Sequence, residues 1–358
     1  MKAVVTGATG VVGANLVRQL LKAGHDVTVL VRETSNLSHL EGLPLTKVRG
    51  DILDLASLAR AASGCDWLFH AASVFAYGGH RADDLEQIAI EGVTNAVEAA
   101  YQMGVGRVIL TGSSVVHGSN RRKAVEDEHG HLSEPAPPAY LSVKAHQHAI
   151  AFERAVERGV ELVTVCPTIV VGPFDARLSP SNASILDYLT DPWKVTFPGG
   201  CNIVSARDVA RGHILAATAG RPGECYILGS ENLEWPAIHS IIADLCGVEG
   251  PNFQANHTSS YLTATMWEMM SWVTGKPPKI TRDQAKMVGR YYWYSHEKAA
   301  ALGFSPMPAR EALAEAISWL VASPHVSAAL RRSLTVSAEV YQARKRWTEE
   351  LGACGVRA

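Results

Sequence analysis

The chain has 358 residues, of which 47% are apolar and 19% are charged, so it can bury a large core. A formal net charge of -2 argues against a nucleic-acid-binding protein, and no apolar run reaches the roughly 18 residues of a membrane span. The six cysteines are scattered without C-x-x-C spacing, which is typical of reduced thiols and predicts a cytoplasmic protein without a disulfide framework or zinc site.

Apolar, strand-like runs alternate with amphipathic helical patterns from the first residues onward. The expected strands are residues 2–7, 26–32, 45–51, 67–72, 107–113 and 161–167, and the expected helices are 11–24, 54–64, 83–104 and 140–159. Strands rich in Val, Ile and Leu between such helices indicate a parallel sheet covered on both faces. The sequence therefore predicts an α/β fold with a Rossmann-type, doubly wound sheet.

The alternation changes after residue 167. We expect loops over 173–202, a strand and helix over 203–220, a strand at 224–230, mostly helices to about 320 and one more helix at 325–351. The predicted domains are a Rossmann domain at 1–167, to which 203–230 returns, a smaller and mostly helical substrate domain from 168–202 and 231–320, and a helical extension at 321–358.

The first expected strand runs directly into three glycines with the spacing G-x-x-G-x-x-G, and a helix follows. Glycines let the backbone turn tightly and approach a pyrophosphate, whose charge is met by the N–H groups and the dipole of the helix N-terminus. We predict a dinucleotide-binding turn with contacts from Gly7, Thr9, Gly10, Val11, Val12 and Gly13.

The residue after the second expected strand helps to decide which dinucleotide fits. An acidic residue there would bind the ribose 2′-hydroxyl of NAD, whereas the Arg32 guanidinium suits the 2′-phosphate of NADP. Arg32 therefore favours NADP(H). The adjacent Glu33 argues for NAD(H), which stays the alternative. Asp51, followed by Ile52, ends the third expected strand, where we expect contact with the adenine amino group.

The order of these motifs resembles a known family. The glycine turn, "GDILD", "LFHAAS", "EGVTNAVEAA", "RVILTGSSVVHG", Y-x-x-x-K and "CPTIVVGPF" resemble the extended short-chain dehydrogenases/reductases of the NAD-dependent epimerase/dehydratase superfamily. "PTIVVGP", "RDVARGHILA", "GRPGECYILGSEN" and "GKPPKITRDQ" are most similar to its dihydroflavonol-reductase-like branch, which includes hopanoid-associated sugar epimerases and relatives of 3β-hydroxysteroid dehydrogenase. The resemblance covers about residues 1–320.

Tyr140 and Lys144 are the expected catalytic pair. Residues four apart share one helix face, so both side chains can reach one side of a bound nicotinamide. We expect the nearby ammonium to lower the pKa of the phenol. The resemblance implies that Lys144 also holds the ribose hydroxyls, and that Ser113, rather than Ser114, is the catalytic serine that binds the substrate oxygen.

Further cofactor contacts are implied by position in the family pattern. Small residues at the end of the fourth expected strand should let the cofactor lie close to the backbone. The segment after the sixth expected strand should line the nicotinamide carboxamide. The candidates are Ala71, Ala72, Ser73, Pro167, Thr168 and Val170. The chain departs from common family residues at Ala89, His117 and Val143, where many members have Asn, Tyr and Ser. The family also implies a homodimer through helices 83–104 and 140–159.

Histidines with short spacings invite a metal-site interpretation. His129 and His131 lie in a polar loop, and His146 and His148 are two apart on a helix, which points them to different faces. We therefore predict no metal site. His70 is expected to be a packed strand residue.

The leading functional hypothesis is an NADP(H)-dependent reductase of a ketone or aldehyde, reversible with the secondary alcohol. One alternative is a nucleotide-sugar epimerase or dehydratase that retains NAD(P), and another is a non-catalytic dinucleotide-binding regulator. The segments 75–79, 184–189 and 266–273 are apolar and aromatic. They favour a bulky, weakly polar small-molecule substrate over a nucleotide sugar, unless they belong to the core.

The segment 257–275 places Leu262, Met266, Met269, Met270 and Val273 on one broad helical face, with Trp267 and Trp272 beside them. Methionines suit a surface that adapts to an apolar ligand. We expect a mobile helical lid, and the alternative is ordinary core packing.

Overall fold

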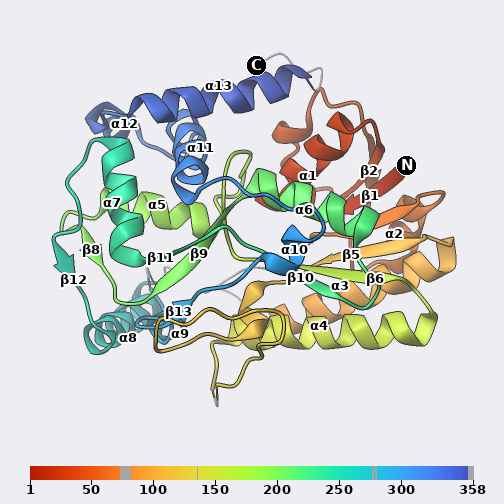
Figure 1. Ribbon diagram of the computed structural model, residues 1–358, viewed down its shortest axis with the longest axis horizontal. Coiled ribbons are helices and arrows are strands. Elements are labelled where there is room, and N and C mark those ends of the chain that lie inside the picture. The colour runs from red at the N-terminus through yellow and green to blue at the C-terminus, as the bar shows by residue number, and fades with distance from the viewer. Residues whose placement is uncertain (73–81, 135, 276–277, 279, 354–358) are drawn as a thin grey trace.

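The computed structural model describes residues 1–72, 82–134, 136–275, 278 and 280–353 (Figure 1). Its main feature is a seven-stranded, all-parallel sheet with the strand order β10-β6-β5-β4-β1-β2-β3. The strands are β1 (Lys2–Thr6), β2 (Asp26–Val31), β3 (Thr46–Arg49), β4 (Trp67–His70), β5 (Arg107–Thr111), β6 (Leu162–Pro167) and β10 (Cys225–Leu228). This topology confirms the predicted Rossmann-type fold.

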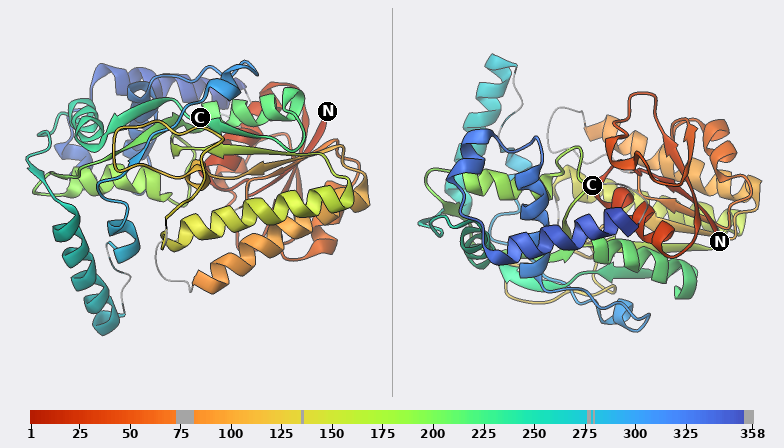
Figure 2. Two further views of the ribbon diagram at one scale, coloured as in Figure 1. Left: turned by 60° about the horizontal axis from the view of Figure 1, so that its bottom comes forward. Right: turned by 90° about the horizontal axis from the view of Figure 1, so that it is seen from above.

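Neighbouring residues of each strand enter different cores on the two faces of the sheet. Val5 packs in the core beneath α1 (Val11–Lys22) and α6 (Ala206–Ala219), whereas the adjacent Val4 packs on the opposite face. That face is covered by α2 (Leu55–Ala62), α3 (Ala82–Met103) and α4 (Ala139–Arg158), of which α3 and α4 lie side by side (Figure 2). Burial on both sides explains why the strands lack polar alternation.

A second, mixed sheet was not expected from the sequence. It contains β7 (Ile169–Val171), β9 (Gly200–Ser205), β11 (Glu231–Glu234) and β13 (Tyr291–Tyr292), and β11 alone runs antiparallel to β9. β8 (Val195–Thr196) and β12 (Phe253–Gln254) form a separate parallel pair. Several of these strands have only two or three residues, too few to show a period.

The expectation of loops over 173–202 is wrong for its middle part. Helix α5 (Pro180–Thr190) begins with proline in its first turn, and Ile185, Tyr188 and Leu189 are buried at helical spacing. The apolar segment 184–189 therefore belongs to the core, as its alternative interpretation held.

The C-terminal part is helical, but the single helix expected at 325–351 is wrong. The structure has α12 (Ala328–Ser333) and α13 (Ala338–Ala353), separated by an extended Leu334. The intervening Thr335 and Ser337 donate backbone hydrogen bonds to the carbonyls of Cys246 and Leu245. These carbonyls lie in the last turn of α7 (Trp235–Cys246), where they lack donors from their own helix, so the linker supplies its N–H groups and leaves the helical path. The remaining helices are η1 (Ser38–Leu40), η2 (Ser114–His117), α8 (His257–Thr274), α9 (Arg282–Ala285), α10 (Glu297–Ala300) and α11 (Ala309–Ala322).

Helix α8 projects from the rest of the molecule (Figure 2). A capping box of Asn256 and Ser259 begins it, and Gly275 ends it at φ 67°. Met269 is 66% exposed and Trp272 is 91% exposed, so the alternative of ordinary core packing is wrong for this face. The lid remains a prediction, as does the division into domains. Among the described residues, none of the helices combines the length and apolar character that crossing a bilayer would need.

Candidate active site

The predicted glycine turn lies where the strand order reverses, between β1 and β4. Open α/β sheets bind their ligands at such a switch point, beyond the carboxyl ends of the strands. Gly7 has φ +71°, and a Cβ atom on it would lie 2.5 Å from the backbone nitrogen of Ala72. A Cβ on Gly13 would lie 2.2 Å from the Gly7 carbonyl oxygen. A side chain at either position would clash with the neighbouring backbone, so the turn requires glycine. A turn of bare backbone lets a ligand approach closely.

Helix α1 begins at this turn with its N–H groups available. Gly10 is its N-cap residue, and no side chain caps the helix and no acidic residue occupies its first turn. Thr9 is buried just before it, whereas Val11 and Val12 are half-buried at its start. An uncapped, positive helix terminus fits the pyrophosphate of a dinucleotide.

Arg32 follows β2 and is exposed, and its neighbour Glu33 forms an ion pair with Arg49 of β3. The carboxylate that argued for NAD is therefore engaged elsewhere. Burial, followed by the charge of Arg32, lowers the pKa of Arg177, so the two guanidinium groups are within electrostatic range of each other. Sequence reasoning missed Arg177 because it belongs to a long loop after β7, where no periodic pattern indicates its position.

The loop that carries Arg177 has a strained backbone. Phe174 and Leu178 have φ values of 65° and 54°, which side-chain-bearing residues rarely adopt. Helix α1 holds this loop, because the Asn15 side-chain amide donates to the Pro173 carbonyl oxygen at 2.9 Å. The Arg18 guanidinium also lies 3.8 Å from the centre of the Phe174 ring. The loop and the glycine turn are thus joined to one helix.

Asp51 and Ile52 lie beyond the carboxyl end of β3 and are half-buried. Asp51 Oδ1 accepts a hydrogen bond from Leu53 N at 3.0 Å, and Asn95 Nδ2 donates to Ile52 O at 2.9 Å. Ala71 and Ala72 follow β4 beside the glycine turn. Ser73 and the apolar segment 75–79 lie outside the described residues.

Ser113 and Tyr140 meet beyond β5, and Lys144 lies one turn after Tyr140 on α4. Ser113 precedes η2 and is 8% exposed, and Lys144 is 3% exposed. A hydrogen bond with Ser113 favours the phenolate of Tyr140, but burial outweighs it and raises the pKa of Tyr140 to about 12. Ser114 instead hydrogen-bonds Tyr294. Of the two candidate serines, Ser113 is the one positioned against Tyr140.

Lys144 contacts another residue of α4, and its expected effect on the pKa of Tyr140 stays a prediction. Its ammonium donates to Gln147 Oε1 at 2.9 Å, and burial lowers the pKa of Lys144 to about 8. Gln147 in turn donates to the backbone carbonyl of Ala89 at 3.3 Å. Sequence reasoning missed Gln147, although its spacing of three from Lys144 and seven from Tyr140 places it on the same helix face.

Pro167, Thr168 and Val170 lead from the main sheet into the mixed sheet. The Thr168 hydroxyl donates to Asn202 Oδ1 at 2.9 Å, and the Thr168 N–H donates to the Leu228 carbonyl at 3.2 Å. Val170 packs half-buried against the core beneath α1. These residues lie at the carboxyl end of β6, on the same edge of the sheet as the glycine turn.

The histidines singled out in the sequence lie in different surroundings. His129 and His131 are exposed, and His146 forms an ion pair with Glu86 at 2.6 Å. His70 is 1% exposed, as expected for a packed strand residue, and hydrogen-bonds the Thr6 hydroxyl at 3.1 Å. Burial, followed by the charge of Lys144, lowers the pKa of His70 to about 3, so this imidazole is neutral.

Known proteins resemble the chain over most of its length. A family model described as "NAD dependent epimerase/dehydratase family" matches residues 3–229. A protein named "Putative dihydroflavonol 4-reductase" from Synechocystis sp. is 32% identical, covering 88% of this chain and 93% of that protein. Cinnamoyl-CoA reductase 1 of Oryza sativa subsp. japonica is 30% identical, with coverages of 90% and 91%. The solved structure described as "Crystal structure of gox2253" has a TM-score of 0.80 at 31% identity, covering 91% of this chain and 99% of that chain.

Proposed function

The chain belongs to the NAD dependent epimerase/dehydratase family, and we propose that it is an NADP(H)-dependent reductase of a bulky, weakly polar ketone or aldehyde, reversible with the secondary alcohol. The observation that carries this proposal is the grouping of Ser113, Tyr140 and Lys144 at the same sheet edge as the glycine turn. Two relatives named as reductases, a putative dihydroflavonol 4-reductase and a cinnamoyl-CoA reductase, support the reductase class.

The residues at the switch point fit a nicotinamide dinucleotide. Gly7, Gly10 and Gly13 would hold the pyrophosphate at the start of α1, and Ala72 and Thr168 would border the cofactor farther along the sheet edge. When bound, the nicotinamide supplies the hydride that is exchanged with the carbonyl carbon.

The side chains of the chain itself would handle the oxygen and the proton. The Ser113 hydroxyl donates a hydrogen bond to the substrate oxygen and fixes it beside Tyr140. Tyr140 donates its phenolic proton to that oxygen as the alcohol forms. Lys144, whose pKa of about 8 lets it carry a proton near neutral pH, then favours return of a proton to the phenolate and holds the ribose hydroxyls.

NADP(H) is favoured over NAD(H) by the charges beyond β2. Arg32 and Arg177 lie within electrostatic range of each other, and such a pair of cations suits the two negative charges of a 2′-phosphate. Glu33 is paired with Arg49 at the surface, which weakens the main argument for NAD(H).

A homodimer through α3 and α4 is part of the proposal. Large apolar side chains are exposed on these two helices, including Tyr101, Phe152 and Val156. Arg158 lies with its guanidinium 5.2 Å from the Tyr101 ring centre and also pairs with Glu98, so the two helices present one joined surface.

The test is an NADPH-oxidation screen against aromatic and aliphatic ketones, aldehydes and nucleotide sugars. The reductase proposal expects stoichiometric NADPH oxidation with a bulky carbonyl compound. Conversion of a nucleotide sugar without net cofactor consumption would instead favour the epimerase. Running the screen with NADH in parallel tests the cofactor preference in the same experiment.

A further inference from the structure

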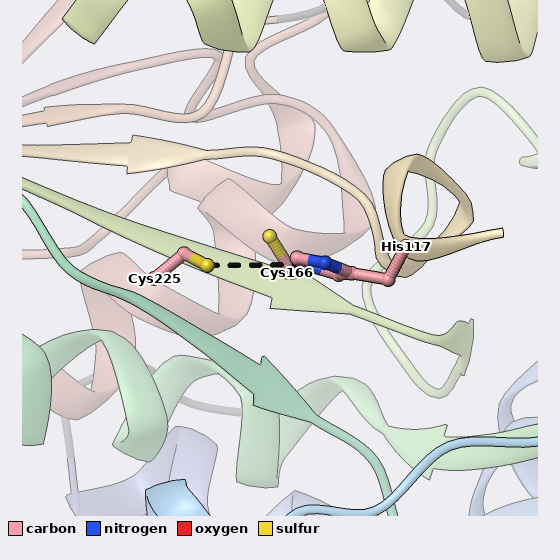
Figure 3. Close-up of side chains that lie close together, drawn as sticks. All are labelled: His117, Cys166 and Cys225. Carbon is pink, nitrogen blue, oxygen red and sulfur yellow. Dashed lines mark hydrogen bonds between the residues drawn. The ribbon is translucent and has the colours of Figure 1, made fainter. Parts of the chain in front are cut away.

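A cluster of metal-ligand side chains lies behind the candidate active site. It contains His117 from the end of η2, Cys166 from β6 and Cys225 from β10 (Figure 3). The His117 and Cys166 side chains are buried, Cys225 is half-buried, and their donor atoms all lie within 4.8 Å of one another. Cys225 Sγ is 3.8 Å from His117 Nε2. Three separate segments thus point soft donor atoms at one place.

Strand register explains how the two cysteines meet. Cys225 pairs with Thr164, and Cys166 pairs with Ile227, so the cysteines are offset by two residues along neighbouring parallel strands. Residues two apart point to the same face of a sheet, which places both thiols on one face. This face is the one toward α4, because Leu162 of β6 packs there with Ala151 and Ala155.

The spacing suits a shared ion better than a disulfide. Neighbouring strands about 4.8 Å apart, with a rise of about 3.3 Å per residue, place the two Cα atoms about 8 Å apart, beyond the roughly 4.4–6.8 Å of a disulfide. Tetrahedral zinc has bonds of about 2.3 Å to sulfur and about 2.0 Å to nitrogen, so two sulfur ligands are about 3.8 Å apart, two nitrogens about 3.3 Å, and a sulfur and a nitrogen about 3.5 Å. The 3.8 Å between Cys225 and His117 is close to this length.

The His117 ring is oriented as a metal ligand requires. Its Nδ1 lies 3.3 Å from the carbonyl oxygen of Gly130, which only an N–H at that position can satisfy. Nε2 is directed to Cys225 and would give up any proton to a bound ion, and a backbone carbonyl on the other nitrogen is the usual support of a ligating histidine. Gly130 fits because a Cβ atom there would lie 2.4 Å from the His117 carbonyl oxygen.

A candidate fourth donor lies outside this group of three, whose atoms are all within 4.8 Å of one another. His148 lies one turn after Lys144 on α4, and its buried Nδ1 has no hydrogen-bond partner among the described residues. It is close enough to interact electrostatically with both Cys225 and His117. An orphaned buried nitrogen beside an incomplete ligand set is the expected appearance of a missing ligand.

We propose that His117, Cys166 and Cys225 bind a Zn²⁺ ion, with His148 completing a tetrahedral Cys₂His₂ site. Two thiolates balance the charge of the ion, and zinc is the divalent metal that tetrahedral sulfur and nitrogen donors favour. This inference departs from the sequence-based prediction of no metal site.

With four protein ligands the site is closed, so its role is structural. The ion would join η2, β6, β10 and α4 behind the active site. The backbone N–H of Ser113 hydrogen-bonds the Cys166 thiol, so the ion would also fix the turn that carries Ser113. The inference is independent of the proposed function, because it is tested by metal content rather than by turnover.

The first experiment measures zinc by atomic spectrometry after loading and desalting the full chain. We expect stoichiometric zinc in the natural chain and its loss in Cys225→Ala and His117→Ala. The matched controls are Cys65→Ala, which removes a buried thiol elsewhere, and His146→Ala, which removes an exposed histidine on α4, the helix that carries His148. Both controls should retain zinc. Far less than stoichiometric zinc in the natural chain would overturn the proposal.

A second measurement does not depend on the variants folding. Cobalt replaces zinc in the natural chain, and thiolate ligands give an intense charge-transfer band in the near ultraviolet. We expect this band together with the visible absorption of tetrahedral cobalt, and its removal by added zinc. Stoichiometric cobalt without the thiolate band would exclude the two cysteines. His148→Ala should weaken binding, and unchanged affinity would overturn the assignment of His148 alone.

Discussion

At the residue scale, burial shifts the ionisation of Tyr140 and Lys144 in opposite directions. The pKa of the phenol is raised to about 12 and that of the ammonium is lowered to about 8, so burial favours the neutral form of each. A neutral phenol is the form that can donate a proton to a substrate oxygen. Removing the Tyr140 hydroxyl, the Ser113 hydroxyl or the Lys144 amine should therefore have separable effects on turnover and stability.

Tyr140→Phe should remove nearly all turnover and leave cofactor affinity within a few-fold, because it deletes only the proton-donating hydroxyl. Ser113→Ala should also reduce turnover strongly, whereas Ser114→Ala, whose hydroxyl bonds Tyr294, should reduce it far less. Steady-state kinetics and cofactor titration by fluorescence measure both quantities. Wild-type rates in the variant without the Tyr140 hydroxyl would show that the proposed acid is wrong.

Lys144→Met should stabilise the protein below about pH 8. The lysine titrates at about 8 when folded and at 10.5 when unfolded, so the unfolded chain holds an extra proton between these values. The natural chain therefore gains stability as pH rises through this window. Below the window, the cost of burying the charged ammonium remains in full and lowers the free energy of unfolding by on the order of 3 kcal/mol. The gain of the variant should be largest near pH 7 and disappear above 10.5. Urea unfolding of both chains near pH 7 and pH 10 checks this; a gain independent of pH would contradict it.

Arg32→Ala and Arg177→Ala should each weaken NADP(H) binding by roughly 10–100-fold and change NAD(H) binding little. A charge-assisted phosphate contact contributes about 1.5–3 kcal/mol, and NAD lacks that phosphate. The control is Arg154→Ala, since this exposed arginine pairs with Glu157 on α4. Dissociation constants for both cofactors are measured by titration. Equal losses for the two cofactors would show a structural role for these arginines.

At the element scale, α8 exposes most of its apolar face. Leu262 and Val273 are 65% and 80% exposed, whereas Ser260 and Ala264 are its buried residues. The Arg282 side chain of α9 pairs with Glu268, which joins α8 to its neighbour. Exposed apolar faces of this kind mark surfaces that bind a ligand or another protein, and binding of the substrate is the basis of the lid hypothesis.

Replacing Met266 and Met270 together with alanine tests the lid. They are 54% and 46% exposed, so stability should change by at most about 1 kcal/mol, whereas the Michaelis constant for large apolar carbonyls should rise. Ile185→Ala is the matched core control and should cost about 2–5 kcal/mol. Thermal unfolding and kinetics with a small and a large substrate separate the two effects. Unchanged substrate preference would contradict the lid.

At the scale of the whole molecule, the proposed dimer depends on the joined surface of α3 and α4. Phe152→Glu combined with Val156→Glu should produce a monomer, because both exposed side chains would place charge in the apolar interface. Trp193→Glu is the control, since Trp193 is 75% exposed on another part of the molecule. Light scattering after size-exclusion chromatography measures the mass. A natural chain that is monomeric at assay concentration would end this proposal.

The sequence by itself determined the features that depend on neighbouring residues. Alternating strands and helices predicted the parallel sheet, because each element must bury its apolar residues and shows this in its period. The glycine turn was identified because its spacing is local and its backbone excludes side chains, as the 2.2 Å approach at Gly13 shows. The family followed from the order of such local motifs.

Only the tertiary structure decided which distant segments meet. It placed Arg177 within electrostatic range of Arg32, directed Glu33 to Arg49, and joined short strands into the mixed sheet. It also brought Cys225 to Cys166 and His117, although none of them forms a motif in the chain. Such contacts depend on strand register and on the packing of loops between elements far apart in sequence. No local period or propensity records them, because their energy arises only when the whole core closes.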